Sequence, residues 1–249
     1  MNIVQPEITL LASTVVDAGT FQLDEDTLDI TGDLLGMDIQ LGSTDSETLM
    51  TYAGRGCYES WHRPSQATYE DADYLKRTAF DMAHGSILEH ANITLRFSGV
   101  SRAWLAEMER HRHLSWSVAS QRYVDGTAFG VVMPPAIRDA DPKVRDAWYA
   151  STVRSYTEYE DLVDSLSHLP RKQAREAARS VLPSAVETRG VVTGNIRAWA
   201  NIIPLRAAAG ADAEMQEVTR RILDVVEPVA PSIFREVRVG LKENERNWS

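Results

Sequence analysis

The sequence predicts an α+β fold that forms a single domain over residues 1–249. Three observations support this prediction. Strand-like alternation occurs in the first half, amphipathic helical patterns dominate the second half, and the chain is 43% hydrophobic and 25% charged, as in ordinary globular proteins. No internal repeat or low-complexity linker divides the chain, and 249 residues are enough to bury a substantial core.

Four segments have the pattern of extended chain. Residues 92–100 alternate polar positions with the apolar Ile93, Leu95 and Phe97, which predicts a half-buried strand. The apolar segment 7–16 also predicts a strand. Residues 129–137 predict a short extended piece that two prolines end, and residues 234–241 are compatible with a final strand.

Helical patterns account for most of the remaining chain. Residues 67–85 predict an amphipathic helix that ends at Gly85 and has Leu75 and Phe80 among its apolar positions. Ser101 is placed to cap a helix with Trp104, Leu105 and Met108 on one side. Further helices are expected at about 141–168, 171–182, 197–209 (kinked at Pro204) and 212–226. The acidic segment 17–51 predicts surface loops with room for one short strand.

Composition excludes several classes of function. The formal net charge of -10 argues against general nucleic-acid binding, which needs a basic face. No apolar run approaches the roughly 20 residues of a membrane span, and the N-terminal segment lacks the basic flank of a signal peptide. Cys57 is the only cysteine, so no internal disulfide can form, and a cytoplasmic location is expected.

Residues 110–123 concentrate three arginines, two histidines and three serines in this acidic chain. Arginine forks and serine hydroxyls are donors that suit phosphate groups. No acidic residue lies between Glu109 and Asp125, so the cations are expected to repel one another unless a ligand or a partner chain neutralises them. The segment therefore predicts a site for phosphorylated ligands.

A second cationic set, Arg171, Arg175 and Arg179, has the i, i+4, i+8 spacing of one helix face. It can be a solvated stripe paired with Glu176, or it can hold an anion.

Other site types have weaker support. His84, Glu89 and His90 do not have the spacing of a zinc site, so no metal is expected. Cys57 lacks the histidine pattern of a cysteine nucleophile. An RNA-binding module would need a basic surface and more stacking aromatics than the segment offers.

The residues Arg110, His111, Arg112, Ser115, Ser120 and Arg122 fill every fixed position of the Arg-His-Arg signature of the flavin-dependent thymidylate synthases. Further likeness extends over about residues 50–215, including "HGSILEH", "RKQAREAARSVLP" and "VETRGVVTGNIRAW". The chain therefore resembles that family. The resemblance implies a central sheet flanked by helices and a homotetramer whose active sites are shared between subunits.

The resemblance also implies a reaction and its cofactors. FAD, reduced by NADPH, would help transfer a methylene group from methylenetetrahydrofolate to C5 of a uridine nucleotide, without a cysteine nucleophile. The chain would thus be a flavoprotein methyltransferase of nucleotide biosynthesis. Neither nucleic acid nor a membrane is an expected partner.

Roles carried over from the family fall on two groups of residues. The FAD contacts would be Arg110, His111, Arg112, Asn195, Arg197 and Asn201, together with His84 and Ser86 from another subunit. The nucleotide contacts would be Glu107, Ser120, Gln121, Arg122, Tyr123, Lys172 and Arg179. Arg206 would activate the uracil, and Arg171 and Arg175 would lie at the surface or at subunit contacts.

Three positions depart from the family pattern. Val118 replaces a Glu or Gln, Ala119 replaces a large aliphatic residue, and Gly210 replaces a histidine found in many members. The first two changes add room beside the nucleotide sugar, so we hypothesise that UMP is methylated, with dUMP as a further substrate. The alternatives are an ordinary thymidylate synthase acting on dUMP, and a binder that has lost turnover.

Overall fold

The computed structural model describes residues 1–17, 44–58 and 71–247. These residues fall into two compact units. The first unit contains Met1–Thr9, Arg96–Val192 and Gly210–Arg221, and the second contains Leu10–Leu95, Thr193–Ala209 and Ile222–Ser249.

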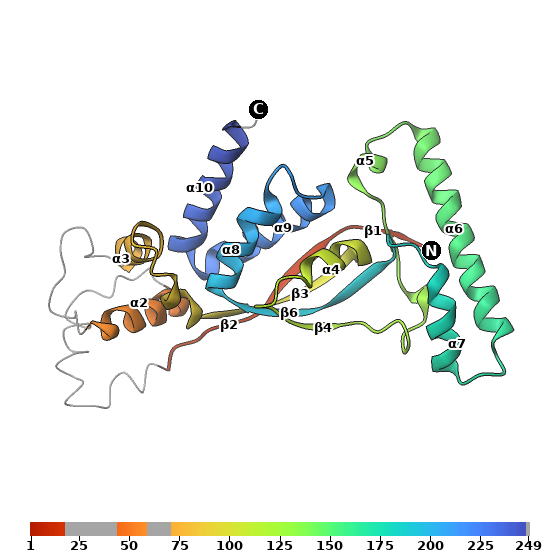
Figure 1. Cartoon of the computed structure of the whole chain (residues 1–249), viewed down its shortest axis with the longest axis horizontal. Helices are drawn as coiled ribbons and strands as arrows, with labels where there is room; N and C mark the ends of the chain where they lie inside the picture. The colour runs from red at the N-terminus through yellow and green to blue at the C-terminus, as the bar shows by residue number, and fades with distance from the viewer. Residues whose placement is uncertain (18–43, 59–70, 248–249) are drawn as a thin grey trace. The chain divides into compact units, whose positions relative to one another are not determined.

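The strands of the described residues form two sheets (Figure 1). The larger sheet has the order β2-β3-β6-β4, with β2 at Glu7–Ser13, β3 at Asn92–Ser101, β4 at Ser115–Val118 and β6 at Glu187–Asn195. The smaller sheet pairs β1 (Ile3–Val4) in parallel with β5 (Val131–Val132). The strands predicted at 7–16 and 92–100 are thereby confirmed, and residues 129–137 contain the short β5.

The alternation in β3 and the cap that follows it are as predicted. Ile93, Leu95 and Phe97 are at most 1% exposed. Ser101 accepts a hydrogen bond from the backbone N–H of Trp104 at 3.0 Å and so starts α4 (Arg102–Met108). This short helix leads directly into the Arg110–Arg112 segment.

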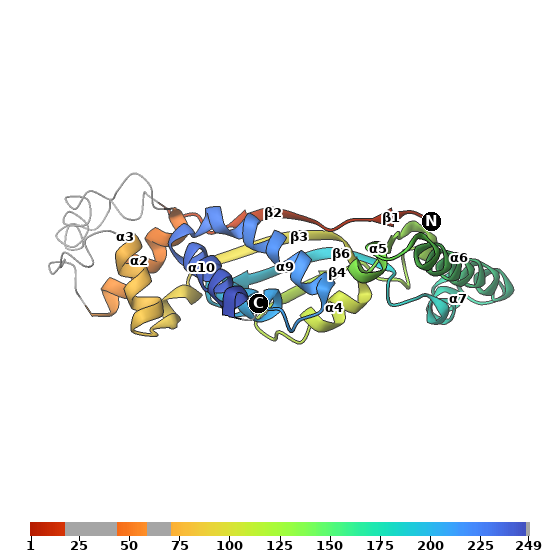
Figure 2. The same cartoon turned by 90° about the horizontal axis from the view of Figure 1, so that it is seen from above.

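The other helices of the first unit are α5 (Pro135–Arg138), α6 (Pro142–Ser165) and α7 (Arg171–Ala178), with 3-10 turns at Gly126–Ala128 and Arg179–Val181. The helices predicted at 141–168 and 171–182 are confirmed. Figures 1 and 2 both show α6 beside α7. Tyr156 of α6 packs into a core cluster with Phe129, Val131 and Val186, where its hydroxyl donates to the carbonyl of Gly130 at 3.0 Å. Burial, with a smaller effect of the Glu187 charge, raises the pKa of Tyr156.

The second unit contains α2 (Asp45–Cys57), α3 (Asp71–Lys76), a π turn (Arg77–Asp81), a 3-10 helix (Gly85–Glu89), α8 (Ile196–Ala207), a 3-10 turn (Glu227–Val229) and α10 (Pro231–Asn247). The helix α9 (Ala213–Val226) has residues in both units. The predictions at 197–209, with Pro204 inside the helix, and at 212–226 are confirmed.

Three predictions of secondary structure are wrong in part. The segment 234–241 lies within α10, because Phe234, Val237 and Leu241 have helical spacing and are buried together. The segment 17–51 ends in α2, which Thr44 caps by accepting from the N–H of Glu47. The remainder of that segment, 18–43, lies outside the described residues.

The helix predicted to reach Gly85 stops earlier. Its regular turns end at Asp81, and Ala83 has a left-handed φ of 56°. Leu75 is fully buried as expected, but Phe80 is 42% exposed. Gly85 begins the following 3-10 helix instead of ending the previous one.

Two buried carboxylates connect segments of the first unit. Glu187 accepts hydrogen bonds from the backbone N–H groups of Gly99 (3.1 Å) and Gly130 (2.9 Å). Glu214 accepts from the backbone N–H of Ser101 at 2.8 Å and from its hydroxyl at 2.6 Å. Burial raises the pKa of Glu214, although the bonds from Ser101 oppose that shift.

Candidate active site

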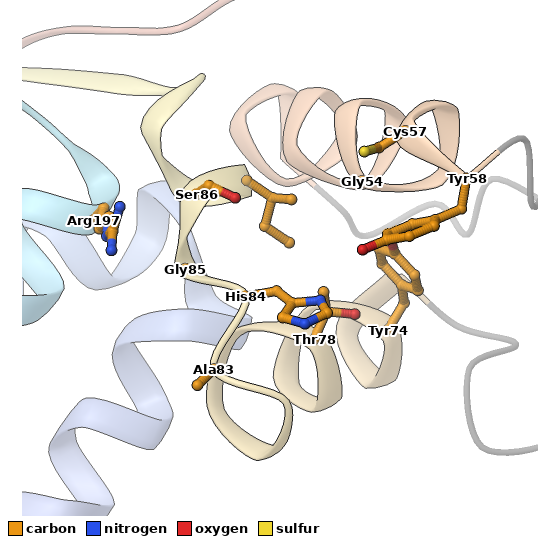
Figure 3. A pocket seen from close by; sticks show the side chains of 11 residues that line it. Gly54, Cys57, Tyr58, Tyr74, Thr78, Ala83, His84, Gly85, Ser86 and Arg197 are labelled. Carbon is orange, nitrogen blue, oxygen red and sulfur yellow. The ribbon is translucent and has the colours of Figure 1, made fainter.

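The second unit contains a pocket of about 320 Å³ at the position of the "HGSILEH" segment (Figure 3). Its walls come from α2, from α3 and the π turn, from the 3-10 helix, and from the first turn of α8. The lining includes Cys57, Tyr74, Thr78, His84, Ser86 and Arg197. Thus His84, Ser86 and Arg197, all predicted as flavin contacts, line one pocket of the same chain, although His84 and Ser86 are predicted to come from another subunit than Arg197.

A sharp turn sets the direction of the His84–Ser86 segment. After the left-handed Ala83, the N–H of His84 donates to the carbonyl of Thr78 at 2.9 Å. Gly85 allows a close approach, because a Cβ at that position would lie 3.3 Å from Nε of Arg197. The absence of a side chain at Gly85 therefore lets the Arg197 guanidinium lie against the pocket wall.

The charged groups of this pocket are partly open to solvent. Arg197 forms an ion pair with Glu89, and the two side chains are 46% and 48% exposed. Tyr74 lines the pocket, and its ring lies under the buried Arg55 guanidinium, whose Cζ is 4.6 Å from the ring centroid. Burial raises the pKa of Tyr74, although a hydrogen bond with Thr78 and the charge of Arg55 oppose the shift.

The pocket suits part of a flavin nucleotide. A guanidinium, an imidazole and a hydroxyl supply donors, and the tyrosine rings supply flat apolar surface. Its volume is at the low end of the roughly 300–1,000 Å³ of ligand pockets, so it can hold one portion of FAD and not the whole molecule.

The other residues predicted around α8 have different surroundings. The Asn195 side chain accepts from the N–H of Ala198 at 2.8 Å and so caps α8. Asn201 is exposed, and Arg206 is half-buried in the last turn. None of these three lines the pocket near His84.

In the first unit, the Arg-His-Arg segment follows α4. Arg110 forms an ion pair with Glu107 at 3.3 Å, and both side chains are largely exposed. The N–H of His111 donates to the carbonyl of Met108 at 3.1 Å. Arg112 is exposed and forms no ion pair with any residue that the structure describes. The expected mutual repulsion is thus too simple, because Glu107 already neutralises Arg110.

The segment Ser120–Asp125, called the nucleotide loop after its predicted role, contacts α7. Nε of Arg122 lies 2.7 Å from a carboxylate oxygen of Glu176. Nζ of Lys172 lies 4.8 Å from the centroid of the Tyr123 ring, and its hydrogen bond and charge lower the pKa of the Tyr123 phenol. Gln121 is 8% exposed, and the Ser120 hydroxyl accepts from the N–H of Arg122 at 3.4 Å.

The arginine stripe of α7 differs from the prediction. The Arg175 side chain is only 13% exposed and donates to the Tyr123 carbonyl at 2.7 Å and to Asp125 at 2.6 Å. Arg175 is therefore not at the surface of the chain as one of its two predicted positions required, because its charge holds the nucleotide loop, and the other, a subunit contact, stays a prediction. Arg179 is half-buried and has no ion pair with any described residue, so its charge can meet an anionic ligand.

Ala119 and Gly210, two of the departures from the family pattern, have different surroundings. Ala119 packs against the core cluster that contains Phe129 and Tyr156, so contacts with this cluster also limit the size of its side chain. A Cβ added at Gly210 would meet no atom within 4 Å, so the position has room for a side chain.

Several residues of the pocket were not predicted. Tyr58, Tyr74 and Thr78 line it, but two tyrosines 16 positions apart and a threonine 4 positions after the second give no spacing typical of a ligand site. Cys57 is exposed at the pocket wall. Among the described residues, no group of three possible metal ligands occurs, and no helix is long and apolar enough to cross a membrane.

Comparisons with known proteins agree with the sequence signature. A family model described as thymidylate synthase complementing protein matches residues 41–232. A probable flavin-dependent thymidylate synthase of Mycobacterium phage L5 is 42% identical over 234 residues, covering 92% of this chain and 96% of that protein. The flavin-dependent thymidylate synthase of Mycobacterium marinum is 42% identical over 202 residues, covering 78% and 80%.

The structure has the same fold as a solved relative. Thymidylate synthase X from Helicobacter pylori, crystallised with FAD and dUMP, superposes with a TM-score of 0.62 at 19% identity, over 94% of this chain and 99% of that one. The α+β fold of these enzymes is therefore present here. Together with the family model and the relatives, this places the chain in the flavin-dependent thymidylate synthase family, as a flavin-dependent methyltransferase of uridylate.

Proposed function

We propose that the protein converts dUMP to dTMP, with FAD as cofactor, methylenetetrahydrofolate as carbon donor and NADPH as reductant. The observation that carries the proposal is the complete Arg-His-Arg signature in a chain 42% identical to thymidylate synthases over most of its length. The similar Helicobacter pylori enzyme, crystallised with FAD and dUMP, supports the same choice of ligands.

The relatives support dUMP better than the UMP preference hypothesised from Val118 and Ala119. The packing of Ala119 against the core cluster offers a second reason for its small side chain, unrelated to the sugar. An ordinary thymidylate synthase, the alternative in the sequence analysis, is thus the better supported function.

On the flavin side, we assign contacts to His84, Ser86, Asn195, Arg197 and Asn201, and phosphate contacts to Arg110, His111 and Arg112. The shared pocket of His84, Ser86 and Arg197 supports the first group. FAD, once reduced by NADPH, would supply the reducing equivalents and help carry the one-carbon unit. The role of this chain is to bind and orient it.

On the nucleotide side, we assign contacts to Glu107, Ser120, Gln121, Arg122, Tyr123, Lys172 and Arg179. The close packing of the nucleotide loop on α7 supports a joint role for Arg122, Tyr123 and Lys172.

Arg206 is the proposed catalytic residue. Its guanidinium would stabilise negative charge on N3 and O4 of the uracil, which makes C5 nucleophilic. C5 would then bond the methylene carbon as the bond of that carbon to the folate nitrogen breaks, and C5 would lose its proton. The reducing equivalents of the reduced flavin would convert the methylene to the methyl group, so no cysteine nucleophile is needed.

We further propose that residues 1–249 act as one catalytic domain and assemble into a homotetramer with shared active sites, in the cytoplasm. The free Cys57 thiol fits a reducing compartment.

The decisive experiment is a competition assay. The purified protein receives FAD, NADPH and methylenetetrahydrofolate with equal amounts of dUMP and UMP, and mass spectrometry quantifies the 5-methyl products. Excess dTMP supports the proposal, and excess 5-methyl-UMP would restore the UMP hypothesis. A protein that binds flavin and nucleotide but forms neither product would be a binder without turnover.

A matched pair of variants tests the catalytic assignment. Arg206→Lys keeps the charge but loses the planar fork, and we expect product formation to fall at least ~100-fold, as for loss of an oxyanion-type donor. Arg154→Lys, on the exposed face of α6, is the control and should keep full activity.

Light scattering of the purified protein measures the oligomeric state and so tests the proposed homotetramer.

A further inference from the structure

Two ion pairs of opposite polarity connect α7 to the nucleotide loop. In one, Arg175 of α7 donates to Asp125 of the loop. In the other, Arg122 of the loop meets Glu176 of α7. Because both pairs join the same two segments, their difference in strength decides which part of the loop is fixed and which can move.

The Arg175 pair is the fixed one. Its guanidinium is 13% exposed and bonds two oxygens, the Tyr123 carbonyl at 2.7 Å and an Asp125 carboxylate oxygen at 2.6 Å. Asp125 also accepts from the N–H of Thr127 at 3.0 Å and from its hydroxyl at 2.8 Å. A sheltered guanidinium with two charge-assisted contacts is held strongly, so residues 123–125 are anchored on α7.

The Arg122 pair is much weaker. Its side chains are 41% and 45% exposed, and a single contact of 2.7 Å joins Nε to the carboxylate. No hydrogen bond accompanies that contact, whereas Arg175 donates two through its terminal nitrogens. Exposed pairs of this kind contribute about 0–1 kcal/mol. Arg122 can therefore leave Glu176 while the rest of the loop stays in place.

Glu176 lies among cations that the proposed function assigns to the nucleotide. Lys172 precedes it by four residues in α7, and Arg179 follows it by three at the start of the adjoining 3-10 turn, so helical spacing puts all three on one side. A carboxylate there repels an anionic nucleotide and occupies one of the guanidinium groups that would bind it.

We propose that Glu176 is an internal competitor of the substrate, which holds Arg122 in the empty site and is displaced from it when the nucleotide binds. This inference rests on the proposed function, since it requires that Arg122 contacts a nucleotide. Glu176 thus lowers the affinity of the site for the nucleotide, because the Arg122–Glu176 pair must break when the nucleotide binds.

The test compares Glu176→Gln and Glu176→Ala with the wild type, all loaded with FAD. Calorimetric titration with dUMP should give a dissociation constant about 3- to 10-fold lower in both variants, as expected when one weak pair and one nearby like charge are removed. The gain should shrink at high ionic strength, because salt screens exposed charges. In turnover assays, KM should fall while kcat does not rise.

The control is Glu158→Gln on the exposed face of α6, which removes the same charge away from the nucleotide loop. Its dissociation constant should match that of the wild type. An affinity gain of equal size in this control would mean that net charge alone is responsible, and would overturn the proposal. Unchanged or weaker dUMP binding in both Glu176 variants would also overturn it.

The proposed function fails in a distinguishable way. If the FAD-loaded wild type shows no binding of dUMP, the nucleotide assignment of Arg122 is wrong, and the role of Glu176 falls with it. If the wild type binds dUMP and the Glu176 variants do not bind it more tightly, only the competitor role is wrong.

Discussion

Removal of the Glu187 carboxylate should destabilise the first unit strongly. Its two oxygens accept from the backbone N–H groups of Gly99 and Gly130, and the residue is 7% exposed. Hydrogen bonds to a charged group contribute about 1.5–3 kcal/mol each, and Glu187→Ala leaves two buried donors unsatisfied. The variant no longer has to bury a carboxylate, which offsets part of this effect. We therefore expect the free energy of unfolding to fall by about 3–5 kcal/mol.

Thermal unfolding followed by circular dichroism measures this cost. For a chain of this size, each kcal/mol lowers Tm by about 2–4 °C, so Glu187→Ala should unfold roughly 6–20 °C below the wild type. Glu187→Gln keeps one acceptor and should lie between the two. The exposed Glu160→Ala of α6 is the control and should change Tm little. A loss under about 1 kcal/mol in Glu187→Ala would refute the reasoning, because it would show that the two N–H groups find other partners.

Three further predictions concern other parts of the chain. Burial raises the pKa of Glu214 above its usual value of 4.5, so the stabilising contribution of the protonated side chain is lost as pH rises above 4.5. The Tm of the wild type relative to Glu214→Gln should therefore fall with rising pH, and a constant difference would contradict this. Gly99→Ala should lower Tm or prevent folding, because Gly99 has a φ of +65° and a Cβ there would collide with the Gln5 carbonyl; wild-type stability would exclude that geometry. Asn195→Ala should lower the free energy of unfolding by about 1 kcal/mol, because the α8 cap is lost, whereas Asn195→Asp should retain the cap and the wild-type Tm. If the Asp variant has the wild-type Tm but binds FAD more weakly, Asn195 contacts the flavin directly.

Local signals predicted a large part of the fold. The alternation of 92–100 and the Ser101 cap depend on neighbouring residues only, and both are present. The strand β6 was missed because Gly190 interrupts its apolar pattern. That glycine is explained by a contact far along the chain: a Cβ there would lie 2.9 Å from the Phe97 ring and would collide with the Ser117 carbonyl. Strand pairing of this kind cannot be read from spacing.

The candidate site shows the same division between local and distant information. The Arg-His-Arg signature identified the cations from their order in the chain. Their counter-charges come from elsewhere: Glu176 meets Arg122 across 54 positions, and Arg175 reaches Asp125 across 50. The repulsion expected within 110–123 therefore leaves out part of the electrostatics, since folding brings Glu176, an acid distant in sequence, next to Arg122.

The position of Arg175 shows why a helical stripe could not be assigned residue by residue. The i, i+4, i+8 spacing predicts one helix face for the three arginines, but it cannot say what that face meets. Arg171 and Arg175 lie in α7, and Arg179 begins the 3-10 turn that follows it. The nucleotide loop covers the stripe at Arg175, where the Tyr123 carbonyl and Asp125 require a cation. Arg179 lies one turn further on, where no described acid pairs with it. Packing therefore separates Arg175, whose charge is used within the described part of the chain, from Arg179, whose charge is not, although the i, i+4, i+8 spacing alone presents the two as equivalent.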